Sequence, residues 1–164
     1  SELAGKAGPF PGEVSSLAFD AKGRWLAVGC SNRVDLWDPE TRKICTQITA
    51  YGDRVSVLST PSGDLLIGDR RGVRQVNPSS GATVQQLSPP SGAIHYMSLD
   101  PGRSSLVTGG EDQCVRIWDL SEGRQSWAFE LRRNITGLAV NRAASVAIAF
   151  GDGKGLLWLM GRGV

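Results

Sequence analysis

The sequence predicts an all-β protein made of small antiparallel sheets, and three observations support this prediction. Tryptophan-containing tetrapeptides recur about every 40 residues, a separate set of strand-opening residues has the same period, and short apolar runs alternate with turns rich in Gly, Pro, Asp and Asn. No segment has the sustained apolar spacing of three and four residues that a substantial helix requires. The 164 residues, 40% of them apolar, are enough for a packed core.

The tryptophan tetrapeptides give the first measure of the repeat. IWDL at 117–120 has a close copy, LWDP at 36–39, a weaker copy, LWLM at 157–160, and a degenerate copy, QVNP at 75–78. The anchors lie 39, 42 and 40 residues apart and comprise Trp37, Val76, Trp118 and Trp158.

Strand-opening residues give a second, independent measure. They are spaced by 41, 39 and 41 residues and comprise Val14, Val55, Ile94 and Ile135. The third residue after each opener is apolar, and these residues are Leu17, Leu58, Met97 and Leu138. Two unrelated sets with one period indicate a true repeat.

Each unit predicts the same order of elements. The opening strand is followed by a polar turn and by a second apolar strand such as WLAVG or SLVTG. A tight turn then leads to the third strand, which holds the tryptophan anchor. In the first three units another turn leads to a fourth strand, such as ICTQI or TVQQL. The fourth unit ends after its third strand.

The period and the Trp-Asp closures resemble the WD-repeat family of β-propellers, over about residues 13–160. The resemblance implies blades of four antiparallel strands around a central channel. We expect a blade at 13–52, a second at 53–92, a third at 93–133 and an incomplete fourth at 134–164. Residues 1–12 fall where an outer strand of a neighbouring or last blade would lie, although Gly and Pro make them a poor strand.

The number of blades predicts an incomplete ring. The family usually has about seven blades, and propellers have roughly four to eight. Three complete blades and one incomplete blade therefore suggest part of a larger propeller, completed by a longer chain, a second copy or another protein. An open arc exposes two apolar blade faces.

The best-conforming unit predicts a structural role for its polar residues. The resemblance implies a hydrogen-bonded set in which Thr108 and Asp112 support the indole of Trp118. The other units depart from the pattern, with Asn32 in place of the turn Asp and Val76 in place of the Trp. The expected structural anchors are Trp37, Asp38, Thr108, Asp112, Trp118, Asp119, Asp152 and Trp158.

No catalytic residue, metal site or cofactor is expected. The single histidine, His95, lies on a strand without a Ser-His-Asp order, and no CxxC pair occurs. The phosphate-loop pattern is incomplete in GDGKG at 151–155, which fits a tight turn. The three cysteines are expected to be ordinary buried thiols.

Basic residues gather on one predicted rim, formed by the loops before the first strands and by the turns between second and third strands. This candidate partner-binding rim comprises Arg33, Arg54, Arg70, Arg71, Arg132, Arg133 and Lys154. Acidic residues share the rim, which favours recognition of protein over a pure phosphate-binding surface.

The predicted function is that of a non-enzymatic scaffold for protein–protein interaction, with an intracellular, cytoplasmic location. The formal net charge of +2 gives no gross signal for nucleic acid or membrane, so the expected partners are other proteins, with self-association to complete the ring. Two alternatives stay open. One is a structural subunit or fragment of a large assembly, and the other is phosphoinositide or nucleic-acid binding through the Arg-rich rim loops.

Overall fold

The structure, a computed structural model, confirms the predicted all-β class. It describes residues 12–87, 92–100, 102, 104–141 and 145–159, and within these ranges there are fifteen strands and no helix. The strands form four antiparallel sheets in which each strand pairs with its neighbour in the chain. The expectation for residues 1–12 falls almost entirely outside the described residues.

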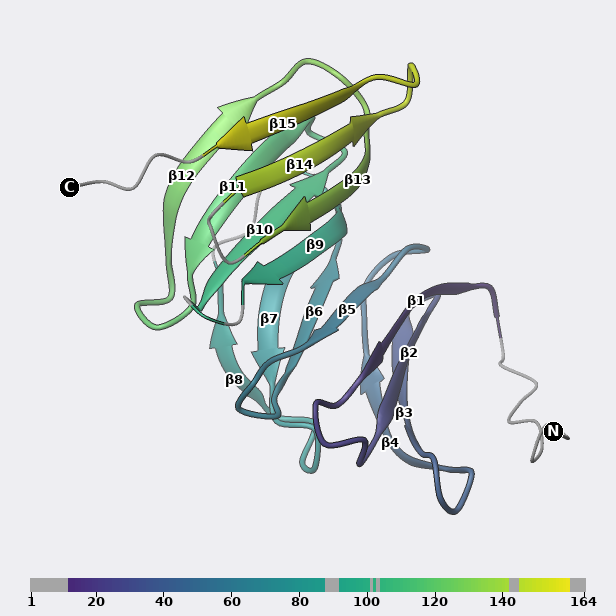
Figure 1. The fold of residues 1–164 in the computed structure, drawn as a ribbon. Coiled ribbons are helices and arrows are strands. Elements are labelled where there is room, and N and C mark those ends of the chain that lie inside the picture. The colour runs from purple at the N-terminus through teal and green to yellow at the C-terminus, as the bar shows by residue number, and fades with distance from the viewer. Residues whose placement is uncertain (1–11, 88–91, 101, 103, 142–144, 160–164) are drawn as a thin grey trace, which may run out of the picture.

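Each sheet is one blade, and three blades have four strands (Figure 1). Blade 1 contains β1 (Val14–Phe19), β2 (Leu26–Cys30), β3 (Arg33–Asp38) and β4 (Lys43–Thr49). Blade 2 contains β5 (Ser56–Ser59), β6 (Leu65–Asp69), β7 (Gly72–Val76) and β8 (Thr83–Gln86). Blade 3 contains β9 (Ile94–Asp100), β10 (Ser105–Gly110), β11 (Cys114–Asp119) and β12 (Arg124–Glu130). Blade 4 has three described strands, β13 (Ile135–Val140), β14 (Ser145–Phe150) and β15 (Gly155–Leu159).

The blades follow one another along an arc. The first strands β1, β5, β9 and β13 lie side by side in that order on the inner side, and blades 1 and 4 stand at opposite ends (Figure 1). The chain thus forms a four-bladed propeller arc, as the repeat predicts.

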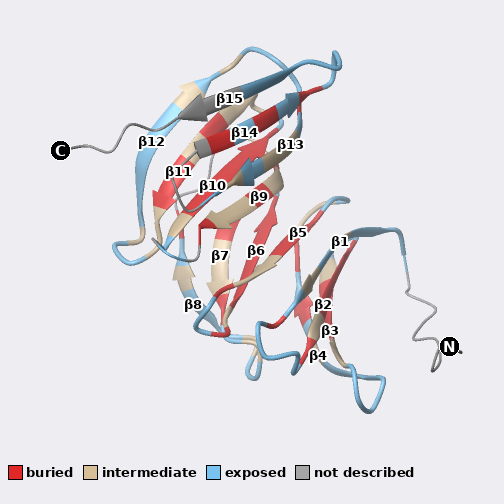
Figure 2. Cartoon of the chain, in the orientation of Figure 1, coloured by how far each residue is buried: buried red, intermediate tan, exposed pale blue. Residues whose placement is uncertain are grey.

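The core consists of three apolar clusters, each between two successive blades (Figure 2). Val34 and Leu36 of blade 1 meet Ile67 of blade 2 in the first cluster, and all three are at most 1% exposed. Burying a side chain of this size contributes about 1.5–3 kcal/mol. Because each cluster needs both of its blades, each blade is stabilised mainly by its neighbours.

The register of blade 2 differs from that of the other three blades. Bulges at the start of β1, β9 and β13 place Leu17, Met97 and Leu138 opposite equivalent residues of the second strand. The described part of β5 shows no bulge, so Val57, which faces Ile67, occupies that position. Leu58, the third residue after the opener of this blade, instead packs against the cluster between blades 2 and 3.

The cysteines are only partly as expected. Cys30 is buried, but Cys114 is half-buried and Cys45 is exposed. The prediction of buried thiols was therefore wrong for Cys45. The pairing of β3 with β4 shifts between Leu36 and Trp37, and Cys45 is the additional residue at this irregularity on the outer strand.

Candidate functional site

The loops before the first strands meet the turns between second and third strands through backbone hydrogen bonds. The amide of Glu111 donates to the carbonyl of Ala93 at 3.1 Å. In blade 4 the amide of Gly151 likewise donates to the carbonyl of Asn134 at 3.0 Å. These bonds place both kinds of loop on one rim of the arc and fix their positions.

The turn of blade 2 carries two adjacent arginines at its tip. Asp69 pairs with Gly72 in the ladder, so the loop between them consists of Arg70 and Arg71 alone. Gly72 has a φ of 102°, which favours glycine, and this allows so short a turn. Both arginines are exposed, and the amide of Arg70 donates to the carbonyl of Tyr51 at 2.9 Å.

Tyr51 is the aromatic platform beneath this turn. The guanidinium of Arg71 lies 3.6 Å from the centroid of the Tyr51 ring, and that of Arg74 lies 5.5 Å from it. Cation–π contacts of this kind contribute about 0.5–1 kcal/mol at exposed sites. They hold the Arg71 side chain against the rim and so limit the conformational entropy that binding would remove.

Asp69 organises the site from below. Its carboxylate accepts hydrogen bonds from the amides of Arg71 at 2.7 Å and Tyr51 at 3.2 Å, and it lies 3.6 Å from the Arg74 guanidinium. Asp69 is 2% exposed. Burial raises the pKa of this carboxyl, against the lowering effect of the two amide donors and of Arg74. Asp69 thus has a structural role, and it supplies little negative charge to the outer surface.

A third exposed arginine lies across the junction between blades 2 and 3. The guanidinium of Arg54 lies 5.7 Å from the centroid of the Tyr96 ring. Next to it, Nε2 of His95 is 3.4 Å from a carboxylate oxygen of Glu111. Burial, followed by repulsion from Arg54, lowers the pKa of His95 below its usual value of 6.5.

The predicted rim cations fall into two groups. Three of them have a carboxylate partner. Arg33 pairs with Asp35 at 2.8 Å, Arg132 with Glu130 at 3.3 Å, and Arg133 with Asp152 at 2.9 Å. Within the ranges that the structure describes, the other predicted rim cations have no carboxylate within 4.0 Å, and these are Arg54, Arg70, Arg71 and Lys154. We call Arg54, Arg70 and Arg71 the basic cluster, because they are exposed and lie on two neighbouring segments of one rim, the loop before blade 2 and the turn of blade 2.

Two contributors to this surface were missed from the sequence, Arg74 and Tyr96. Arg74 lies on β7, where the repeat pattern gave only a strand residue. Tyr96 was considered only as a neighbour of His95. A signal for Arg74 did exist in the sequence. Arg74 closes the segment DRRGVR, four residues after Arg70 and three after Arg71.

The expected anchor residues have structural contacts. The indole N–H of Trp118 donates to Oγ1 of Thr108 at 2.9 Å, and both residues are buried. Asp112 accepts from the amide of Cys114 at 3.2 Å and forms an ion pair with Arg116 at 2.7 Å. The partner of the indole is therefore Thr108, and the partner of the turn carboxylate is Arg116.

The Asp of the Trp-Asp pair shapes the next turn. Asp38 accepts from the amide of Glu40 at 2.7 Å, and Asp119 accepts from the amide of Ser121 at 2.8 Å. Asn77 takes the same role in blade 2 by accepting from the amide of Ser79 at 3.0 Å. The degenerate QVNP copy thus keeps the local chemistry of the turn.

Blade 4 keeps only part of this pattern in the described residues. Asp152 accepts from the amide of Lys154 at 3.1 Å within a turn in which Gly153 has a φ of 78°. GDGKG is therefore a hairpin turn. Trp158 lies opposite Val146 in the sheet, and its side chain is outside the described part of the structure.

Neither a metal-binding group nor a membrane helix is found in the described ranges. No three His, Cys, Asp or Glu side chains there gather in a way that could hold a metal ion. No helix of the described residues is long and apolar enough to cross a membrane.

Comparison with known proteins gives matches to repeat proteins. The family model described as "WD domain, G-beta repeat" matches residues 6–38 and 81–119. WD repeat-containing protein 3 of Mus musculus is 27% identical over 117 residues, which are 66% of this chain and 12% of that protein. Ribosome biogenesis protein ERB1 of Chaetomium globosum is 24% identical over 138 residues, which are 74% of this chain and 18% of that protein. The chain therefore spans less than a fifth of the length of these relatives.

A solved structure matches the arc as a whole. The computationally designed Ika4 protein superposes with a TM-score of 0.83 at 16% sequence identity, over 98% of this chain and 99% of that chain. At this identity the likeness shows the fold alone.

Proposed function

We propose that this chain, which resembles the WD-repeat family of β-propellers, is a non-enzymatic scaffold that docks protein partners on its loop rim. The observation that carries the proposal is the basic cluster of Arg54, Arg70 and Arg71. These guanidinium groups are exposed, and they lie among residues whose backbone is fixed by hydrogen bonds.

The mechanism is rigid presentation of positive charge. Tyr51 and Tyr96 lie beneath Arg71 and Arg54, so these side chains are partly ordered before a partner arrives. Arginine in such a setting forms bidentate hydrogen bonds with carboxylates, and arginines are enriched among residues that dominate binding energy. The partner that this chemistry fits is an acidic segment of another protein.

The names of the relatives suggest the setting. One of the two relatives is named WD repeat-containing protein 3, and the other is named ribosome biogenesis protein ERB1. A role inside a large assembly, and hence an intracellular location, is compatible with the scaffold proposal. In that role the same rim would contact a permanent neighbour rather than an exchanging partner.

Binding of a short polyglutamate peptide labelled with fluorescein tests the proposal. We expect Arg70→Ala combined with Arg71→Ala to weaken binding at least about tenfold, which is about 1.4 kcal/mol. The matched control is Arg124→Ala, because Arg124 is exposed and already paired with Glu122. Equal binding by the wild type and both variants would contradict the proposal.

Two further probes separate the rival ligands. Phosphoinositide-containing vesicles and duplex DNA are offered to the same variants at the same ionic strength, because charge-driven binding weakens steeply with salt. If either probe binds through the basic cluster while the peptide does not bind, the phosphoinositide or nucleic-acid alternative is favoured and the scaffold proposal fails.

A further inference from the structure

The junction between successive blades is built by one rule. At each junction the second strand of the earlier blade provides a glycine. The three glycines are Gly29, Gly68 and Gly109. A Cβ added at Gly68 would lie 2.8 Å from Cγ2 of Ile94, and one at Gly109 would lie 3.0 Å from Cδ1 of Leu138. The glycine side of one blade therefore receives the opening strand of the next blade.

Among the described residues, no blade packs on the receiving side of blade 4. Ala149 pairs with Gly137 just as Gly109 pairs with Tyr96 in blade 3, so Ala149 occupies the position that a glycine holds at the three closed junctions. Ala147 corresponds in the same way to Val107, which is 0% exposed. Ala147 and Ala149 are exposed.

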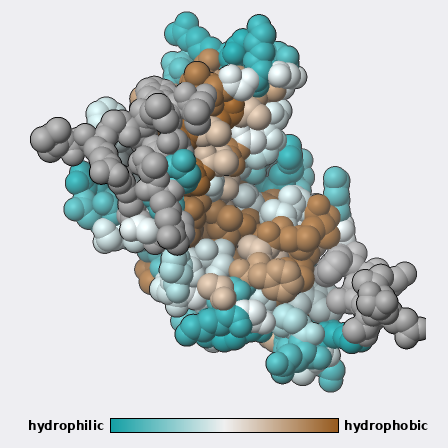
Figure 3. Space-filling view, viewed as in Figure 1, coloured by the Kyte–Doolittle hydropathy of each residue, from teal (hydrophilic) through white to brown (hydrophobic). Residues whose placement is uncertain are grey.

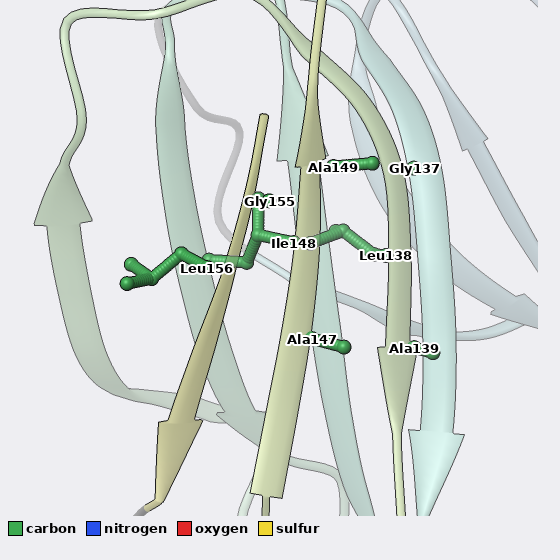
Figure 4. A pocket seen from close by; sticks show the side chains of 8 residues that line it. All are labelled: Gly137, Leu138, Ala139, Ala147, Ile148, Ala149, Gly155 and Leu156. Carbon is green, nitrogen blue, oxygen red and sulfur yellow. The ribbon is translucent and has the colours of Figure 1, made fainter. Parts of the chain in front are cut away.

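The receiving face of blade 4 is an apolar hollow (Figure 4). It has a volume of about 560 Å³, and its lining residues include no charged side chain. The small residues that leave this space open are Gly137, Ala139, Ala147, Ala149 and Gly155.

Blade 1 carries the inserting side, and no blade in the described part of the chain packs on it. Val14 and Leu17 occupy the ladder positions that Ile135 and Leu138 occupy in blade 4. Ile135 is 6% exposed, whereas Val14 is 36% and Leu17 is 59% exposed. Phe19, which follows two residues later on the same strand, is 63% exposed. In the space-filling view, apolar side chains form a band from blade 4 along the inner strands to blade 1 (Figure 3).

We propose that a second copy of this chain covers both faces, so that two arcs close into one eight-bladed ring. The blade 1 face of each copy packs on the blade 4 face of the other, in a contact of the same kind as the three junctions within the chain but with Ala149 in place of the glycine. One chain holds both halves of the junction, at opposite ends of the arc (Figure 1). A two-fold pair therefore satisfies all four end faces and leaves none exposed, which is how a head-to-tail contact closes.

A charge exchange between the two faces tests this pairing. A pair of Leu17→Glu chains would have a carboxylate in the inserting face of both junctions. A pair of Ala149→Arg chains would have a guanidinium in the receiving face of both junctions. Each variant alone should be a folded species of one-chain mass, 17.5 kDa. The control Val84→Glu, at a 60% exposed residue of the outer strand β8, should keep the mass of two chains.

Mixing the two variants is the decisive experiment for this pairing. In the mixed pair one junction is unchanged and the other joins Glu to Arg, so two-chain species should return and contain one copy of each variant. Native mass spectrometry of the mixture, with one variant carrying a tag, measures this composition. Circular dichroism establishes that each variant is folded before mixing.

Three results would overturn the proposal. The first is a wild type with the mass of one chain, which would leave the faces to further blades or to another protein. The second is a wild type that forms heterogeneous aggregates, since a closed pair hides both apolar faces. The third is a two-chain species that persists in both single variants. None of these results bears on the basic cluster, because its variants change peptide binding and not mass.

Discussion

The junction between blades 3 and 4 and the free face of blade 4 have the same architecture but different surroundings. In the junction, Gly109 lies under Ile135 and Leu138, and Val107 is fully buried. On the free face, Ala149 and Ala147 hold the equivalent positions and are exposed. The difference shows that the pattern of a blade specifies which side receives a neighbour, while only the neighbour itself supplies the burial.

The largest expected effect contrasts two tryptophans of blade 3. Trp118 is 2% exposed and lies in the cluster between blades 2 and 3, so Trp118→Ala should lower the free energy of unfolding by about 3–5 kcal/mol. Trp127 on β12 is 63% exposed and stacks on Phe129, so Trp127→Ala should cost about 1 kcal/mol or less. Urea denaturation of both variants measures the two losses, and similar values would contradict the assignment of the core.

The next effect tests the glycine rule at a closed junction. Gly109→Ala places a Cβ 3.0 Å from Leu138 and 3.1 Å from Ile135, so it should destabilise the chain by about 1–3 kcal/mol. In Gly137→Ala the nearest atom is the Cβ of Ala149 at 3.6 Å, an ordinary contact, and Tyr96 already occupies the equivalent position in blade 3. Gly137→Ala should leave unfolding unchanged. A loss at Gly137 as large as at Gly109 would mean that the two faces do not differ as described.

Concentration should change stability if the free faces pair. Tm should then rise with protein concentration, and each tenfold increase should favour the pair by about 1.4 kcal/mol. Leu17→Glu should have a Tm that is independent of concentration. Differential scanning fluorimetry over a concentration series compares the two, and a concentration-independent wild type would argue against pairing.

The smallest expected effect is electrostatic and lies on the rim above a closed junction. Because the pKa of His95 is lowered in the folded chain, the unfolded chain takes up a proton on His95 at higher pH than the folded chain does. Stability should therefore fall slightly as pH decreases through the ordinary histidine range. Arg54→Ala removes a repulsive charge and should raise the pKa of His95, as NMR titration of this single histidine measures.

The control for this titration is Arg124→Ala, whose guanidinium is on blade 3 beside Glu122. The pKa of His95 should be the same in that variant as in the wild type. If Arg54→Ala left the pKa of His95 unchanged, the coupling of the two rim residues across the junction would be absent.

Much of the fold could be predicted because the repeat leaves two periodic signals in the sequence. The anchors and openers predicted the class and the order of strands. They did not indicate that Val57 rather than Leu58 faces Ile67, because a bulge changes register without any clear residue signature. The exposure of Cys45 was missed for the same reason.

The candidate site was predictable only as a collection of charges. The rim pattern identified the arginines, but pairing depends on side-chain directions that spacing does not define. Arg33 pairs with Asp35 two residues away, whereas Arg133 pairs with Asp152 from another loop. The basic cluster follows from these pairings, and its role in binding stays a proposal, as do the blade boundaries.

The most direct test of the central claim is the mass of the unaltered chain in solution, measured by light scattering after gel filtration. The claim is that the two end faces of the arc are halves of one junction and that two copies join them. We predict a single species with twice the 17.5 kDa of one chain. A single species of 17.5 kDa at every concentration would contradict the claim.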